Sequence, residues 1–264
     1  MGLEMTGAAR NGIIVTKLRN AGCVFAEEEA ELLIAAAETP EELYAMADRR
    51  ASGLPLEHVI GWTVFCGLRI AVDPGVFVPR RRTEFLARQA AAFARPSAVV
   101  VDLCCGSGAL GAVVAAALKP VELYGVDIDP AAVRCASRNV AAADGRVYEG
   151  DLYEPLPAAL RGRIDILIAN TPYVPTGAIS LLPPEARLHE AQVALDGGAD
   201  GLDVQRRVAE EAPFWLAPGG RLLVETSERQ ASRTADIFAR SGLIPHEVRC
   251  DELDAVVVIG TLTG

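Results

Sequence analysis

From Thr83 to the C-terminus, apolar runs of strand length alternate with helix-like segments, and this alternation limits the possible folds more than any other feature of the sequence. The runs Ala98–Cys104 and Ile164–Asn170 are almost continuously apolar, which is typical of strands buried on both faces of a parallel sheet. Strands that alternate with helices predict an α/β fold, in which helices cover both faces of a mostly parallel sheet. Two final strands, 244–252 and 255–262, follow one another without a helix and predict one antiparallel edge strand.

Upstream of this alternation, the sequence predicts a small helical bundle and a β-hairpin. Three helices are expected between residues 11 and 53, and the third begins with a capping box formed by Thr39 and Glu42. Residues 61–79 contain short β-like runs around Cys66-Gly67, which indicates a hairpin. The expected domains are therefore a helical bundle at 1–60, a hairpin linker at 61–82 and a ligand-binding α/β domain at 83–264.

The composition argues against several classes of protein. The chain has 264 residues, a net charge of −10 and 51% hydrophobic residues. Proteins that bind nucleic acid usually carry a basic surface, so no direct nucleic-acid contact is expected. No apolar run reaches the length of a membrane span, and the N-terminus lacks a basic-then-apolar signal, so we expect a cytoplasmic protein without membrane contact. The six cysteines lack metal-ligand spacing, which predicts reduced thiols and no metal site, and no pattern predicts the oligomeric state.

A glycine turn and two acidic residues lie at the ends of three successive predicted strands. Gly106 and Gly108 follow the first strand and let a ligand approach the backbone closely. Asp127 ends the second strand and can accept hydrogen bonds from ribose hydroxyls. Asp151 ends the third and can accept from an adenine amino group, while Leu152 covers the ring. For the glycine loop taken alone, a tight turn without a ligand is the alternative interpretation.

The surroundings of the loop favour an adenosine with a cationic tail over a pyrophosphate. The loop matches neither G-x-x-x-x-G-K-[ST] nor the full G-x-G-x-x-G motif. It contains no basic residue, and Asp102 lies just before it, where a carboxylate disfavours pyrophosphate and suits an ammonium group. S-adenosylmethionine has this combination of groups. NAD is the competing interpretation.

The segment Asn170-Thr171-Pro172-Tyr173 ends the fourth strand and suits a planar nitrogen nucleophile. Such a nitrogen, in an amide or an aromatic amine, has a delocalised lone pair and needs its N–H groups held by acceptors. The side-chain carbonyl of Asn170 and the main-chain carbonyl of Thr171, kept extended by Pro172, supply two acceptors that also stabilise positive charge on the nitrogen. Tyr173 can stack on the planar group. A simple turn is the alternative interpretation.

Together these motifs resemble the HemK/PrmC family of protein-(glutamine-N5) methyltransferases over nearly the whole chain. "NTPY" resembles that family's N-P-P-Y, and "VVDLCCGSGALG" resembles its D-L-G-T-G-S-G loop. The resemblance implies a Rossmann-like class I S-adenosylmethionine-dependent methyltransferase fold with a small N-terminal helical domain and a linking hairpin. It also implies that Asn170–Tyr173 hold a substrate glutamine, which in family members is that of the Gly-Gly-Gln loop of peptide-chain release factors. The implied cofactor-binding residues are Cys104, Cys105, Gly106, Ser107, Gly108, Asp127, Asp151, Leu152 and Asn170.

Several departures from the family pattern predict a divergent branch. His189-Glu190 stands where the family tends to have Glu-Pro, "CDELDAVVVIG" lacks the arginine usual near the C-terminus, and the helical domain is short. Thr171 replaces the first proline of N-P-P-Y, although its carbonyl survives, and Cys104 replaces the first loop glycine.

An N6-adenine or N2-guanine nucleic-acid methyltransferase, which uses a similar motif, is one alternative, and the net charge argues against it. A non-catalytic ribosome-associated scaffold is another, and the intact Asn170 and Tyr173 argue against it. Arg80–Arg82 either contact an acidic partner or lie in solvent.

Overall fold

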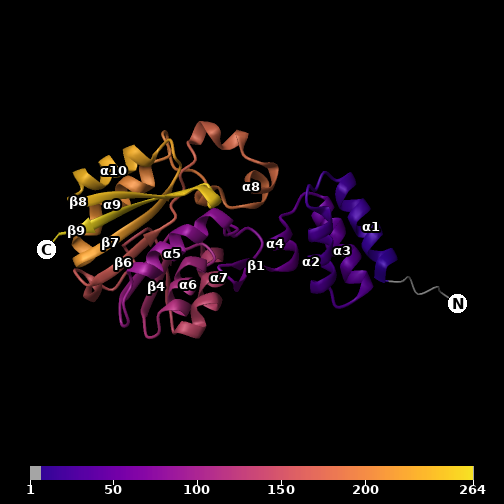
Figure 1. Cartoon of the computed structure of the whole chain (residues 1–264), viewed down its shortest axis with the longest axis horizontal. Helices are drawn as coiled ribbons and strands as arrows, with labels where there is room; N and C mark the ends of the chain where they lie inside the picture. The colour runs from indigo at the N-terminus through magenta and orange to yellow at the C-terminus, as the bar shows by residue number, and fades with distance from the viewer. Residues whose placement is uncertain (1–6, 264) are drawn as a thin grey trace.

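The computed structural model describes residues 7–263 and places a helical bundle at one end of an elongated molecule (Figure 1). Residues 1–6, on which the expected lack of an export signal partly rests, and Gly264 lie outside the described residues. The bundle packs around Ile14, Leu18 and Leu33, which are fully buried. Its helices are α1 (Gly7–Asn20), α2 (Ala26–Ala36), α3 (Pro40–Ala51) and a short α4 (Leu56–Ile60), which the sequence patterns did not indicate.

The predicted N-cap of α3 is present, but the capping box is not closed in the usual way. The Thr39 hydroxyl accepts from the Glu42 main-chain N–H at 3.1 Å. The Glu42 carboxylate accepts from the N–H of Glu38 at 2.7 Å, one residue before the N-cap whose N–H it usually binds. The bond from the Glu42 N–H to Thr39 is therefore present as predicted, but the Glu42 carboxylate binds the N–H of Glu38 instead of that of Thr39.

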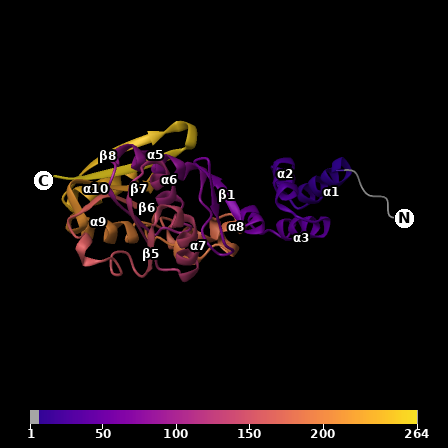
Figure 2. The ribbon, with the colours of Figure 1, turned by 90° about the horizontal axis from the view of Figure 1, so that it is seen from below.

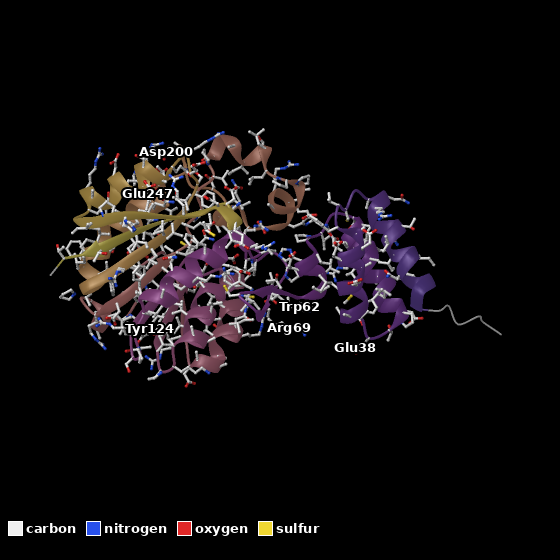
Figure 3. The ribbon with its side chains drawn as sticks, viewed as in Figure 1. Glu38, Trp62, Arg69, Tyr124, Asp200 and Glu247 are labelled. Carbon is white, nitrogen blue, oxygen red and sulfur yellow. The ribbon has the colours of Figure 1, made fainter. Side chains whose placement is uncertain are left out.

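The predicted hairpin joins the bundle to the sheet (Figure 2). Strands β1 (Trp62–Phe65) and β2 (Leu68–Ala71) pair through the turn Cys66-Gly67, in which both residues have positive φ, as a two-residue type I′ turn requires. The guanidinium carbon of Arg69 lies 4.3 Å from the ring centroid of Trp62 across the hairpin (Figure 3). The hairpin is also fixed to the sheet domain, because the Asn139 side chain bonds both the N–H and the C=O of Ala71.

The predicted α/β architecture is confirmed by a seven-stranded sheet in the order β5-β4-β3-β6-β7-β9-β8. Helices α5 and α6 pack on one face and α9 and α10 on the other. The strands are β3 (Val99–Leu103), β4 (Glu122–Asp127), β5 (Arg146–Glu149), β6 (Ile164–Ala169), β7 (Leu216–Thr226), β8 (Leu243–Cys250) and β9 (Ala255–Leu262). The helices of this region are α5 (Glu84–Phe93), α6 (Ala109–Ala117), α7 (Pro130–Val140), α9 (Asp203–Trp215) and α10 (Ala231–Arg240).

The prediction of an antiparallel edge strand is wrong in its position. The antiparallel strand is β9, and it lies between β7 and β8 rather than at the edge. The burial of the two strands explains this order. Val256–Ile259 in β9 are buried, whereas β8 alternates buried or half-buried residues with exposed ones such as Ile244. The more apolar strand therefore takes the interior position, and the more polar one forms the edge.

A long connection between β6 and α9 covers the carboxyl end of the sheet. It contains the helix α8 (Pro184–His189) and short 3₁₀ turns at Thr176–Leu181 and Gln192–Ala194. In Figures 1 and 2, α8 lies between the sheet and the bundle. We call residues 174–195 the covering segment. Among the described residues, none of the helices combines the length and apolarity needed to cross a bilayer.

Candidate active site

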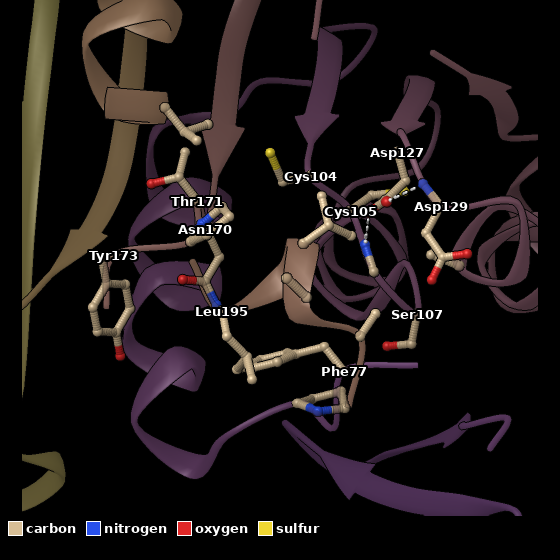
Figure 4. A pocket seen from close by; sticks show the side chains of 18 of the residues that line it. Phe77, Cys104, Cys105, Ser107, Asp127, Asp129, Asn170, Thr171, Tyr173 and Leu195 are labelled. Carbon is tan, nitrogen blue, oxygen red and sulfur yellow. Dashed lines mark hydrogen bonds between the residues drawn. The ribbon is translucent and has the colours of Figure 1, made fainter. Parts of the chain in front are cut away.

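A pocket of about 500 Å³ opens beyond the carboxyl ends of β3, β4 and β6 (Figure 4). This is the end at which open parallel sheets bind their ligands. The pocket gathers the loops that follow these strands together with the covering segment. It brings together every site residue predicted from the sequence except Asp102 and Gly108.

The loop after β3 turns sharply through left-handed backbone conformations. Cys104, Gly106 and Gly108 have φ of 55°, 55° and 76°, so the cysteine occupies a conformation that glycine adopts more easily. A Cβ at Gly108 would lie 3.0 Å from the Cβ of Ala136 on α7, which explains the glycine there by close packing. Burial raises the pKa of the Cys104 and Cys105 thiols, so both are neutral, weakly reactive groups at neutral pH.

The Asp127 carboxylate at the end of β4 lies between the glycine loop and α7. Its Oδ2 accepts from the Gly106 N–H at 2.8 Å and its Oδ1 from the Asp129 N–H at 2.9 Å, as Figure 4 shows. Burial raises the pKa of this carboxyl. Asp129 instead caps α7, because its Oδ1 accepts from the Ala131 N–H. Each Asp127 oxygen keeps a free lone pair, so the group could also accept from a ribose.

Asp151 and Leu152 line the pocket beside Asp127. Asp151 Oδ2 accepts from Arg207 of α9 at 2.7 Å, and both side chains are partly exposed. Leu152 is buried and adopts a positive φ of 50°. The two residues therefore present one acceptor and one apolar surface, a combination that could hold a purine ring and its amino group.

Asp102 lies behind the glycine loop rather than in the pocket. Its side chain is 1% exposed, and its Oδ2 accepts from the Gly111 N–H of α6 at 3.0 Å. Burial raises the pKa of this carboxyl to about 7. In this structure Asp102 supports the start of α6, and it has no direct path to a ligand ammonium group.

Asn170 and Thr171 leave buried polar atoms unused at the end of β6. Within residues 7–263, Asn170 Oδ1, Thr171 Oγ1 and Ser107 Oγ are all buried in the pocket region without a hydrogen-bond partner. A buried polar atom without a partner costs free energy, and in native proteins such an atom usually bonds to protein, water or a ligand. These atoms, the Asp127 carboxylate and a glycine loop without basic residues fit the hydroxyls and the cationic tail of S-adenosylmethionine.

Tyr173 is held from two sides. Its hydroxyl accepts from Arg82, and its main-chain carbonyl accepts from Gln230 Nε2 at 3.1 Å. Burial raises the pKa of its phenol. In Figure 4 the ring lies on the side of Asn170 that faces away from the glycine loop. Substrate stacking on this ring stays a prediction.

Arg80 and Arg82 line the pocket and pair with acidic residues that the sequence does not indicate. Arg80 binds both oxygens of the buried Glu190 at 2.7 and 2.6 Å, and Arg82 binds Glu225 at 3.2 Å. Arg80 and Arg82 therefore form ion pairs within the protein, which neither interpretation of Arg80–Arg82 included, and their side chains stay partly exposed. The partners are more than 100 residues away in sequence, so no local pattern could have identified them.

Comparisons with known proteins bear on the family and the fold. Residues 67–199 match the family described as methyltransferase small domain. A release factor glutamine methyltransferase of Geobacter sulfurreducens is 40% identical over 208 residues, which cover 77% of this chain and 72% of that protein. A 4-amino-L-phenylalanine/4-methylamino-L-phenylalanine methyltransferase of Streptomyces pristinaespiralis is 32% identical over 214 residues, or 78% of this chain and 73% of that protein.

Among solved structures, a methyltransferase from Pyrococcus furiosus has a TM-score of 0.58 at 15% identity and covers 82% of this chain and 100% of its own. This likeness concerns the fold alone. The predicted class I methyltransferase fold is confirmed by it, together with the family match and the observed seven-stranded sheet.

Proposed function

Because this chain belongs to the methyltransferase small domain family and to the family of the release factor glutamine methyltransferases, it is an S-adenosylmethionine-dependent methyltransferase, and we propose that its substrate is a protein glutamine. The proposed target is the side-chain amide nitrogen in the Gly-Gly-Gln loop of a peptide-chain release factor. Such a substrate implies a cytoplasmic location. We retain 1–60, 61–82 and 83–264 as the proposed helical, linker and catalytic domains.

The observation that carries this proposal is the buried Oδ1 of Asn170 at the end of β6, which has no hydrogen-bond partner among residues 7–263. In our proposal this oxygen and the main-chain carbonyl of Thr171 accept the two N–H groups of the substrate amide. The amide lone pair then faces the cofactor side of the pocket, where the loop 104–108, Asp127, Asp151 and Leu152 bind S-adenosylmethionine. Tyr173 packs against the amide plane.

Bound S-adenosylmethionine would supply an electrophilic methyl group and leave as a neutral thioether, and the amide nitrogen would attack with its lone pair and then lose one N–H proton to water. Positive charge develops on the nitrogen during this step. The two carbonyl oxygens are fixed by the strand end and by Pro172, so they stabilise that charge without rearrangement. No strong base is needed, because the methylated cationic amide is very acidic.

The charge distribution favours a protein substrate over nucleic acid. The chain carries a net charge of −10, and the arginines Arg80 and Arg82 at the pocket are paired with Glu190 and Glu225. Pairing reduces the positive potential that a phosphate backbone would need. A protein loop that enters the pocket needs no such potential.

The test is methyl transfer to a purified release factor with methyl-labelled S-adenosylmethionine, followed by mass spectrometry of its peptides. We expect one labelled glutamine in the Gly-Gly-Gln loop. The matched control is the same release factor with that glutamine changed to asparagine, which should stay unlabelled. A parallel incubation with cellular RNA should give no labelled base, and label on RNA or on no protein would contradict the proposal.

A second candidate substrate is an aromatic amine, because the Streptomyces pristinaespiralis relative is named for one. The same two carbonyl oxygens suit an aryl NH₂, which is also planar. Free 4-amino-L-phenylalanine in the same assay separates the two candidates. We expect its kcat/KM to be much lower than that of the release factor, and the reverse order would support the second candidate.

A further inference from the structure

We propose that Arg82 and Glu225 form a charge-compensated pair that positions Tyr173, and with it the segment Asn170–Tyr173, for methyl transfer. The inference rests on the proposed function for the identity of the substrate. The contacts that support it lie within the protein and do not involve the substrate.

The first support is the way in which Tyr173 is held. Arg82 lies in the 3₁₀ turn Arg81–Thr83 before α5, and its Nη2 donates to the Tyr173 hydroxyl. Its guanidinium carbon lies 5.8 Å from the centroid of the tyrosine ring. At the other end of the residue, Gln230 donates to the Tyr173 carbonyl. Both ends of Tyr173 are therefore fixed by elements outside its own loop.

The second support is the burial of Glu225 at the end of β7. Its side chain is 2% exposed, Arg82 Nε donates to its Oε1 at 3.2 Å, and its Oε2 has no hydrogen-bond partner in the part of the chain that the structure describes. A buried carboxylate that is so weakly satisfied contributes little to stability. Arg82 is 46% exposed and lines the pocket, so water already solvates part of its charge. The stability of the fold therefore does not account for the pair.

The electrostatics of the reaction do account for it. Positive charge moves onto the substrate nitrogen, beside the tyrosine that Arg82 holds. Because this charge comes from a sulfonium only a few ångström farther away, an unpaired guanidinium about 10 Å from the nitrogen, at an effective dielectric constant of about 20, would slow such a step about twofold. Glu225 cancels this repulsion and leaves the guanidinium donors free to hold Tyr173. The pair thus acts through Tyr173 and through the local charge, and neither member touches the reacting atoms.

The kinetic test compares wild type, Glu225→Gln, Arg82→Met and the double variant on the release factor. Glu225→Gln keeps the shape of the side chain, and we expect kcat to fall about twofold while KM stays unchanged. The double variant removes both charges, and its kcat should exceed that of Glu225→Gln. Arg81→Met and Glu228→Gln remove charges from exposed neighbours and serve as matched controls with unchanged kcat.

A second readout needs no substrate. Tyrosine labelled with ¹³C at Cζ reports the titration of each of the five tyrosines, and Tyr173→Phe assigns the signal. The charged groups facing this phenol are Glu225, Arg82 and Arg80. Glu225→Gln should lower the pKa of the Tyr173 phenol and Arg82→Met should raise it. Arg82→Met leaves a buried carboxylate unpaired and is the variant at risk of being unstable. Glu225→Gln is isosteric, so its tyrosine signal remains informative even if Arg82→Met does not fold.

Unchanged titration in Glu225→Gln, or kcat losses that simply multiply in the double variant, would overturn the inference. If wild type labels no release factor while the Tyr173 titration shifts as expected, the proposed function fails and the positioning pair stands. The two failures are therefore distinguishable.

Discussion

The two sides of the pocket are built by different means. On the proposed cofactor side, the backbone of the loop 104–108 makes the turn, and its contacts with Asp127 span about twenty residues. On the proposed substrate side, ion pairs join distant segments: Arg80 with Glu190, and Arg82 with Glu225. The cofactor side is therefore a local structure, whereas the substrate side is assembled by the whole fold.

This difference separates binding from catalysis in a testable way. Substitutions on the cofactor side should mainly alter the affinity for S-adenosylmethionine. The groups of that side are positioned by local contacts and do not depend on the substrate side. Damage to the substrate side should alter kcat or the KM for the release factor first, because it moves the acceptors of the amide. The predictions below compare the two sides, from the largest expected effect to the smallest.

Asn170→Ala should cause the largest loss. It removes the buried acceptor Oδ1, and the loss of one preorganised group at a developing charge reduces kcat by about 10²–10³-fold. Methyl transfer to the release factor measures the rate, and calorimetry measures the affinity for S-adenosylmethionine, which should change much less. Asn11→Ala, in α1 of the bundle, is the matched control. An unchanged rate in Asn170→Ala would remove the basis of the proposed function.

Asp102→Asn should have the next largest effect, on stability rather than on rate. The pKa of the Asp102 carboxyl is raised from 3.8 to about 7, so the native state holds a proton that the unfolded chain releases between these values. The free energy of unfolding should therefore fall as the pH rises from about 4 to 7, by about 4 kcal/mol at about 1.4 kcal/mol per unit. The asparagine carries no charge and can still accept from the Gly111 N–H.

Thermal unfolding at pH 4, pH 5 and pH 8 measures this difference. The variant should be more stable than wild type at pH 8, by less at pH 5 and nearly equal at pH 4, while the exposed control Asp144→Asn should show no such dependence. The affinity for S-adenosylmethionine should change by less than about threefold, because Asp102 lies outside the pocket. A larger loss of affinity would support the prediction from the sequence that Asp102 binds the ammonium group of the cofactor.

Two glycine variants compare the sides directly. Gly106→Ala introduces a methyl group with nothing within 4 Å, so it enters the cofactor side of the pocket. Gly201→Ala places a Cβ in steric overlap with the Tyr173 carbonyl oxygen and must displace that residue. Both positions have positive φ, so each variant also loses about 1 kcal/mol or more of stability to backbone strain.

We expect Gly106→Ala to weaken S-adenosylmethionine binding about tenfold and Gly201→Ala to lower kcat about tenfold with nearly unchanged cofactor affinity. Calorimetry and methyl-transfer kinetics on both proteins provide the comparison. If both variants change the same parameter, the division of the pocket into two independently built sides is wrong.

The sequence predicts the proposed cofactor side better than the rest of the pocket. The strand ends that carry Asp127, Asp151 and Asn170 follow from apolar runs and caps, and the structure brings all three to one pocket. The position of β9 was missed because pairing order depends on which strand buries more apolar surface, and adjacent strands in sequence do not reveal this. Asp102 was misplaced because alternation along a strand decides which face a side chain takes.

The covering segment and its ion pairs could not be predicted from local patterns. Short helices such as α8 have weak periodicity, and Glu190 pairs with Arg80 across 110 residues. Buried charges of this kind become evident only when the fold brings them together. The same holds for Arg50 of α3, which joins the bundle to α8 and leads to the last prediction.

Glu185→Gln should produce the smallest effect, on the KM for the release factor. Arg50 is buried, binds Glu29 through Nε and Nη2, and donates from Nη1 to Glu185 Oε1 at 2.6 Å. Glu185 lines the pocket and is 47% exposed, so solvent screens the pair and its contribution is about 0.5–1 kcal/mol. Weakening it should loosen the covering segment against the bundle and raise KM about two- to fivefold, with kcat unchanged.

The matched control is Glu31→Gln, which removes an exposed carboxylate from α2. Because the Arg50–Glu185 pair is partly screened, the difference in KM between Glu185→Gln and wild type should shrink as the salt concentration rises. A fall in kcat instead of a rise in KM would mean that α8 acts on the transfer step itself. The substrate side would then extend from Tyr173 through the covering segment to the helical bundle.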